Sequence, residues 1–139
     1  EQALVYARRI DGRLAIIGDR SACANVSEVM NIIGNVAGAT CVIVDDLDDT
    51  AGTLAEAARS LMNAGAESVY AAIAHPVLSG PAIKRLIESP LTELIVTDSI
   101  PLRSEARDCG KIHVVSIAAH IGEAIRRINN EESVSSLFD

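Results

Sequence analysis

Short apolar runs rich in valine and isoleucine alternate along this chain with segments whose apolar residues recur at helical spacing. The clearest run is CVIV at residues 41–44, and the other strand candidates span residues 14–18, 29–34, 68–75, 93–99 and 112–117. Helices are expected at residues 3–10, 53–65 and 80–89 and from residue 117 onward. Because parallel strands are joined by helical crossovers, this alternation predicts an α/β fold with a mostly parallel sheet flanked by helices on both faces.

The core of such a fold must be built here almost without aromatic side chains. The 139 residues include only two tyrosines and one phenylalanine, although 49% of them are apolar. Alanine, valine, isoleucine and leucine therefore have to fill the interior, and the length suits a single domain spanning residues 1–139.

Charge and cysteine content exclude several classes of partner. The formal net charge is −7 and no basic run occurs, which argues against a nucleic acid or an anionic membrane surface. Three widely spaced cysteines without a CxxC pair favour reduced thiols in a cytoplasmic protein. No apolar run reaches the roughly 20 residues that a membrane helix needs.

Residues 41–54, CVIVDDLDDTAGTL, place four aspartates within five positions between a strand and a helix. Ligands of parallel sheets bind beyond the carboxyl ends of the strands, beside the N-terminus of the next helix. Small Ala51 and Gly52 let the backbone approach a ligand, and the hydroxyls of Thr50 and Thr53 and nearby N–H groups can bind an anion such as phosphate.

The aspartates need a different role, because carboxylates repel phosphate. Asp45 and Asp46 can accept hydrogen bonds from a sugar diol or hold Mg²⁺ through oxygen ligands. The alternative is structural: Asp49 would be the N-cap of the following helix, and the other aspartates would be solvated turn residues.

The segment VIVDDLDDTAGTL resembles the phosphoribosyl-diphosphate (PRPP) binding motif of type I phosphoribosyltransferases and of ribose-phosphate pyrophosphokinase, or PRPP synthetase. The segments ANVSEVMNIIGNVAG, AAIAHPVLSGPAI, VTDSIPL and EAIRRINNEESVSSLF are similar to consecutive parts of the synthetase C-terminal domain, in the same order. The resemblance covers nearly the whole chain and implies a phosphoribosyltransferase-like fold.

This resemblance implies a role for most of the acidic segment. Asp45 and Asp46 would bind the ribose hydroxyls and the associated Mg²⁺. The loop around the 5-phosphate of ribose 5-phosphate would consist of Asp49, Thr50, Ala51, Gly52 and Thr53. Leu47 and Asp48 occupy variable positions of the motif, and Asp48 receives no role.

The family reaction transfers the β,γ-diphosphoryl group of ATP to ribose 5-phosphate and yields PRPP and AMP. Family members have an N-terminal domain that supplies much of the ATP site and is absent from these residues. The resemblance further implies a homo-oligomer.

One segment departs from the family pattern. The position aligned with the catalytic lysine is Asp19, and only Arg20 remains basic before ANV. A carboxylate beside transferring phosphates reverses the local field, so we expect the isolated chain to be inactive in this transfer. Two interpretations remain: a ribose 5-phosphate-binding part of a synthetase, or an inactive, synthetase-associated regulatory protein. A phosphoribosyltransferase that consumes PRPP fits the C-terminal segments less well.

A few other residues carry two interpretations each. Ser133 and Ser135 match serines that contribute to a regulatory phosphate or ADP site in many synthetases, but they also suit a plain polar tail. His75 ends a strand and either lines the site or is structural. Ser79 precedes Gly80 and Pro81 and is expected to start a helix.

Overall fold

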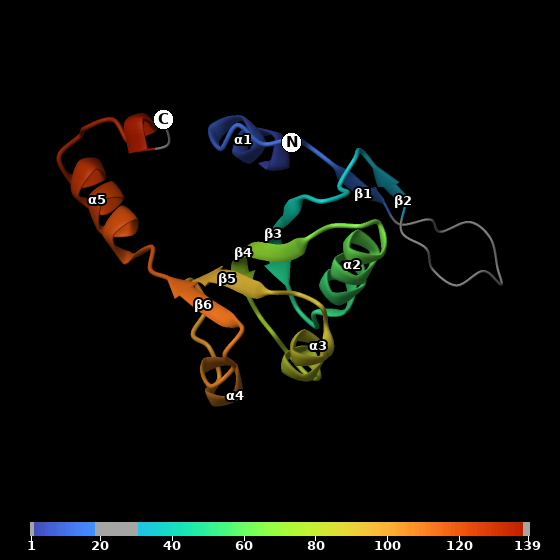
Figure 1. The fold of residues 1–139 in the computed structure, drawn as a ribbon. Helices are drawn as coiled ribbons and strands as arrows, with labels where there is room; N and C mark the ends of the chain where they lie inside the picture. Colours follow the sequence, from blue (N-terminus) through green and yellow to red (C-terminus); the bar gives the residue numbers. More distant parts are fainter. Residues whose placement is uncertain (1, 19–30, 138–139) are drawn as a thin grey trace.

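The computed structural model describes residues 2–18 and 31–137 (Figure 1). Its elements are α1 (Gln2–Arg9), β1 (Ile16–Gly18), β2 (Asn31–Ile33), β3 (Thr40–Asp48), α2 (Gly52–Asn63), β4 (Ser68–Pro76), α3 (Ala82–Glu88), β5 (Glu93–Thr97), α4 (Ser104–Arg107), β6 (Ile112–Val115), α5 (Ala118–Asn129) and a 3₁₀ turn (Ser135–Leu137). Every expected strand and helix is present within a few residues of its predicted bounds. Helix α4 was not predicted, since its four residues carry too short a pattern.

The main sheet has four parallel strands in the order β3-β4-β5-β6. Its register pairs Val42 with Tyr70 and Leu94 with Ile112. Strands β1 and β2 form a separate antiparallel pair. Helices α2 and α3 lie together beside the sheet, and α1 lies across β3 from α2 (Figure 1). The predicted α/β class with a parallel sheet flanked by helices is confirmed.

Aliphatic side chains fill the space between the sheet and its helices. The largest fully buried ones include Leu86 of α3, Val69 of β4, and Leu94 and Val96 of β5. Strands β4 and β5 alternate buried and half-buried residues, so one face of each strand packs against the helices. Among the described residues no aromatic side chain is buried, in agreement with the composition.

The C-terminus of α3 is held by a lysine from the segment before β6. Lys111 Nζ donates to the carbonyl oxygens of Leu86, Ile87 and Ser89 at 2.8–3.2 Å. A cation at this position satisfies carbonyls that have no partner within the helix and interacts favourably with the helix dipole. Helix α3 is therefore fixed at one end, which matters for the site because it contacts the β3–α2 loop.

Helix α5 has the expected apolar stripe, but the stripe is not covered. Ile121, Ile125 and Ile128 are between 51% and 67% exposed, and no residue of α5 is buried. Figure 1 shows the helix extending away from β6. In the described part of the chain, no helix is long and apolar enough to cross a membrane.

Candidate functional site

The acidic segment lies at the carboxyl edge of the parallel sheet, as predicted. Strand β3 is longer than expected and continues through Asp48, so the first three aspartates are strand residues. The prediction that all four crowd into one turn is wrong, because β3 stays paired with β4 as far as Asp48 and Pro76. The turn itself begins at Asp49 and leads directly into α2.

A cavity of about 340 Å³ opens between the end of β3 and the first turns of α2. Of the predicted ribose and phosphate residues, Asp45, Asp49, Thr50, Gly52 and Thr53 line it. The remaining walls are Ile43, Leu47, Asp48, Leu54, Ala57 and Ile73. Five of the seven predicted ligand-binding residues therefore surround one space at a helix N-terminus.

The two other predicted residues do not line this cavity. Asp46 follows Asp45 on a strand, so its side chain points to the opposite face of the sheet. Ala51 is fully buried and sits just before α2 with a φ of 55°. Ala51 therefore contributes its backbone conformation to the loop.

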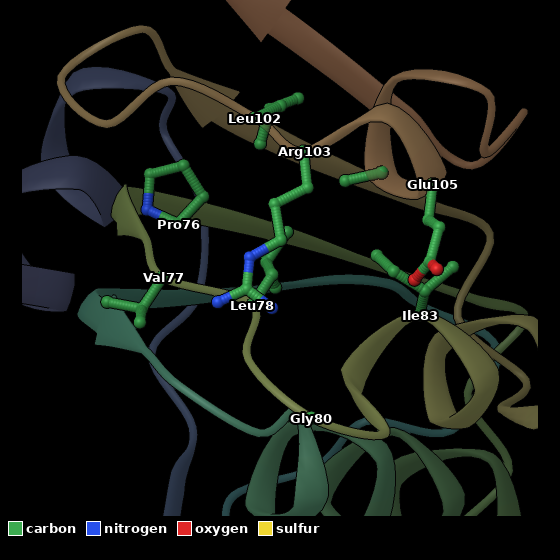
Figure 2. A pocket seen from close by; sticks show the side chains of 9 residues that line it. Pro76, Val77, Leu78, Gly80, Ile83, Leu102, Arg103 and Glu105 are labelled. Atoms are coloured by element: carbon green, nitrogen blue, oxygen red, sulfur yellow. The ribbon is translucent and has the colours of Figure 1, made fainter.

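A second cavity lies nearby, between the β4–α3 segment and the start of α4. Figure 2 shows Arg103 and Glu105 facing Leu78 and Ile83 across it. Its volume is about 10 Å³, which is room for roughly one water molecule. Of these two cavities, the larger one has room for a sugar phosphate.

The oxygen ligands at the end of β3 fit Mg²⁺. This ion is typically held by one or two carboxylates together with water and substrate oxygens. Asp45 lines the cavity, and its Oδ1 accepts the Asp46 N–H at 2.9 Å, which leaves the other carboxylate oxygen available. Among the described residues no group of three or more His, Cys, Asp or Glu side chains is placed to hold a metal by itself. A bound Mg²⁺ would therefore share its coordination with the ligand.

Asp48 organises the loop, although the sequence suggested no role for it. Its Oδ1 accepts the Ala51 N–H at 3.1 Å, while its Oδ2 is buried without a hydrogen-bond partner. Burial raises the pKa of the Asp48 carboxyl; the Ala51 hydrogen bond opposes this, and the charges of Asp45 and Asp49 add to it. The folded chain therefore carries a cost when Asp48 is ionised.

Because ionised Asp48 destabilises the folded chain, Asp48→Asn is expected to raise the free energy of unfolding by an amount that depends on pH. Because the pKa of Asp48 is raised in the folded chain, its protonated carboxyl contributes stability to the fold. This contribution is fully present below about pH 4, near the pKa of the group in the unfolded chain. It is lost as the pH rises through the folded value. We expect the free energy of unfolding of Asp48→Asn, relative to the parent, to be higher at pH 7 than at pH 4. Urea unfolding at both pH values measures this, with exposed Asp108→Asn as the control. An equal difference at both pH values would contradict the prediction.

Asp49 is not the N-cap of α2. That position is Ala51, and no side chain caps the helix. The carboxylate of Asp49 instead accepts a short hydrogen bond from the hydroxyl of Ser79, and its carbonyl oxygen accepts the Ser79 N–H at 2.6 Å. Ser79 does not start α3 as expected, because the helix begins at Ala82 after Pro81 and no side chain caps it. Ser79 joins two loops that are 30 residues apart.

Two of the three histidines lie near polar groups at or beside the sheet. His75 Nδ1 lies 2.9 Å from Ser99 Oγ, which also donates to the carbonyl oxygen of Ala74. His113 is exposed on β6, with its Nδ1 3.9 Å from Glu93. His75 is therefore tied to the β5 end of the sheet, which favours the structural interpretation of this residue.

The two tail serines belong to a cluster at the end of α5. Arg127 donates to the carbonyl oxygen of Ser133 and to Ser136 Oγ, and the Ser135 N–H donates to Ser133 Oγ. Hydrogen bonds from Arg126 and Arg127 lower the pKa of Glu123 to about 2. This cluster lies away from the β3–α2 loop (Figure 1), and the regulatory role of Ser133 and Ser135 stays a prediction. Asp19, Arg20 and Cys23 fall outside the described residues.

Comparison with known proteins agrees with this geometry. A profile of the phosphoribosyl synthetase-associated domain family matches residues 19–139. The chain belongs to this family. Ribose-phosphate pyrophosphokinase from Bordetella pertussis is 58% identical over 99% of the chain, and the enzyme from Nitrosomonas europaea is 54% identical over 95% of it. The chain spans 44% and 42% of these two proteins, less than half of their length.

A solved structure extends the similarity to the fold. Phosphoribosylpyrophosphate synthetase from Mycobacterium smegmatis aligns with 94% of the chain at a TM-score of 0.81 and 32% identity. The alignment covers 42% of that protein. The relationship to PRPP synthetases inferred from the motif is thus confirmed, and the assignment to their C-terminal domain stays a prediction.

Proposed function

We propose that this chain is the ribose 5-phosphate-binding part of a ribose-phosphate diphosphokinase. The observation that carries the proposal is the cavity at the carboxyl edge of the sheet, which is lined by Asp45, Asp49 and Thr50 and by the first residues of α2. An acidic strand end beside a helix N-terminus offers acceptors for sugar hydroxyls and donors for a phosphate within one space. The family relationship supports the same ligand.

Different residues of the site bind the sugar and the phosphate of the ligand. Asp45, which lines the cavity, accepts hydrogen bonds from the ribose hydroxyls and holds Mg²⁺ together with ligand oxygens. The N–H groups of Gly52 and Thr53 belong to the first turn of α2, where no carbonyl of the helix can accept them, so they are available for the 5-phosphate. The hydroxyls of Thr50 and Thr53 add two further donors. When bound, Mg²⁺ offsets the charge of the phosphates against the aspartates.

The transfer of diphosphate from ATP requires more than this site. Catalysis of phosphoryl transfer rests on positioning and on cationic stabilisation of the transferring group. Asp19 places a carboxylate where the family motif has lysine, so we propose that this chain alone does not form PRPP. ATP use, a homo-oligomeric assembly and a cytoplasmic location stay predictions. The second candidate, a regulatory protein that retains the sugar site, is favoured by Asp19 alone.

Calorimetry tests whether the chain binds ribose 5-phosphate. Titration of the chain with ribose 5-phosphate in Mg²⁺ is expected to give saturable binding, because both halves of the ligand meet matching groups. Ribose and inorganic phosphate, each titrated separately, are expected to bind at least about tenfold more weakly, since each loses one set of hydrogen bonds. Equal affinities for ribose 5-phosphate and inorganic phosphate would refute a sugar-phosphate site.

An enzyme-coupled assay tests the absence of transfer. With ATP, Mg²⁺ and ribose 5-phosphate, AMP release by the chain is expected to remain at the uncatalysed level. A relative with lysine at the position of Asp19 serves as the positive control. Robust AMP release by the purified chain would show that the proposed inactivity is wrong while leaving the ligand assignment intact.

A further inference from the structure

The loop between β3 and α2 is contacted from outside by the segment that links β4 to α3. The carbonyl oxygen of Asp48 accepts the N–H groups of Val77 and Leu78 at 3.1 and 3.2 Å. The next carbonyl oxygen, of Asp49, accepts the Ser79 N–H. These contacts place α3 directly against the proposed phosphate-binding loop.

One peptide group of the loop is held at both ends. The carbonyl oxygen of Thr50 accepts a hydrogen bond from Arg85 Nη1 at 3.0 Å, and the N–H of Ala51, in the same planar peptide, donates to Asp48 Oδ1 at 3.1 Å. The orientation of this peptide determines where the following N–H groups of Gly52 and Thr53 point. Arg85 thereby acts on the amides that face the cavity.

The backbone around this peptide needs such support. Ala51 and Leu78 both have positive φ values, 55° and 45°, in the left-handed region that side chains disfavour. Strained conformations of this kind persist only where surrounding contacts determine them. Asp48, Ser79 and Arg85 provide those contacts on the two facing loops.

Gly52 leaves the space that the guanidinium occupies. A Cβ atom at Gly52 would lie 3.2 Å from Arg85 Nη1, closer than an ordinary van der Waals contact. Arg85 also brings a positive charge to a loop and strand end that carry four aspartates. A side chain at position 52 would therefore require the Arg85 guanidinium to shift by a few tenths of an ångström.

We infer that Arg85 is a positioning residue for the sugar-phosphate site, and that Gly52 lacks a side chain to make room for it. The inference rests on the proposed function for its ligand, a sugar phosphate. Arg85 acts through the Thr50–Ala51 peptide and is not required to touch the ligand.

Calorimetry with ribose 5-phosphate and Mg²⁺ tests the inference in three variants. Arg85→Met is expected to weaken binding about tenfold, on the scale of one hydrogen bond from a charged donor. Lys84→Met removes the same charge from the same helix without contacting the loop, and it should change the affinity by less than about twofold. Arg85→Lys, which keeps the positive charge and can still donate a hydrogen bond, should restore part of the loss.

A double-mutant cycle separates positioning from a general effect. Gly52→Ala displaces the guanidinium, so it should weaken binding in the parent but have a much smaller effect when Arg85 is already methionine. Additive losses, or an affinity of Arg85→Met equal to that of Lys84→Met, would overturn the inference.

A ligand-free measurement keeps this inference distinct from the proposed function. In ¹H–¹⁵N spectra of the free chain, Arg85→Met is expected to shift the amide signals of Gly52 and Thr53, and Lys84→Met is not. Unchanged signals in Arg85→Met would overturn the positioning role, whatever the ligand. If the signals shifted and the parent bound no ribose 5-phosphate, the proposed function would fail and the sugar-phosphate part of the inference with it.

Discussion

Replacing Leu86 with alanine is expected to lower the free energy of unfolding by about 2–5 kcal/mol, the range found when a buried leucine is truncated and leaves a cavity. Leu86 is completely buried between α3 and the sheet. The truncation reduces the apolar area that folding removes from water. It also removes dispersion contacts, which the surrounding side chains restore only in part. Among the described residues, no buried aromatic side chain is present to fill the space that is left.

Urea unfolding followed by far-UV circular dichroism measures this loss. Ile87→Ala is the matched control, since Ile87 is the next residue of α3 and is 58% exposed. We expect the control to change the free energy of unfolding by less than about 0.5 kcal/mol. Similar losses in the two variants would mean that α3 is not packed as described, and the position of Arg85 would then be wrong as well.

Replacing Asp45 and Asp46 together with asparagine is expected to weaken ribose 5-phosphate binding at least about a hundredfold. Each hydrogen bond to a charged group contributes on the order of 1.5–3 kcal/mol, and the Asp45 carboxylate is also needed for Mg²⁺. Asp46 is replaced as well because the motif assigns it the same role. Asparagine keeps the size of the side chain and an oxygen that can still accept the Asp46 N–H. The substitution therefore removes charge with little change of shape.

Calorimetry with and without Mg²⁺ provides the measurement for this double variant. The control is Glu67→Gln combined with Asp108→Asn, which removes two carboxylates from exposed positions just before β4 and before β6, at the opposite edge of the sheet. The control is expected to bind as the parent does. Equal affinities for the parent and for Asp45→Asn with Asp46→Asn would show that these aspartates do not hold the ligand.

The fold could be predicted from the sequence where local pattern decides the structure. The CVIV run and the apolar spacing of residues 54–61 predict a buried strand and its crossover helix, and both are present. Helix α4 could not be predicted, because four residues carry too short a pattern. The exposure of Ile121, Ile125 and Ile128 was also unpredictable, since an apolar helical stripe does not reveal what covers it.

The sequence predicted most of the residues that line the cavity but missed the residues that hold the β3–α2 loop from outside. The acidic motif identified Asp45 and the residues from Asp49 to Thr53, and all of these except Ala51 line one cavity. Ser79 and Arg85 were missed because they are 30 and 35 residues from their partners in the loop, and no local pattern indicates such contacts. Asp48 was given no role, although its burial and its hydrogen bond to Ala51 shape the turn.

The central claim is that the segment from Asp45 to Thr53 holds a sugar phosphate, and an NMR titration tests it most directly. Backbone amide signals of the chain are recorded while ribose 5-phosphate is added in Mg²⁺. We predict that the largest shifts occur at Asp45, Asp46 and the amides of residues 49–53. Shifts confined to α5 and the tail around Ser133, or no saturable shifts at all, would contradict the claim.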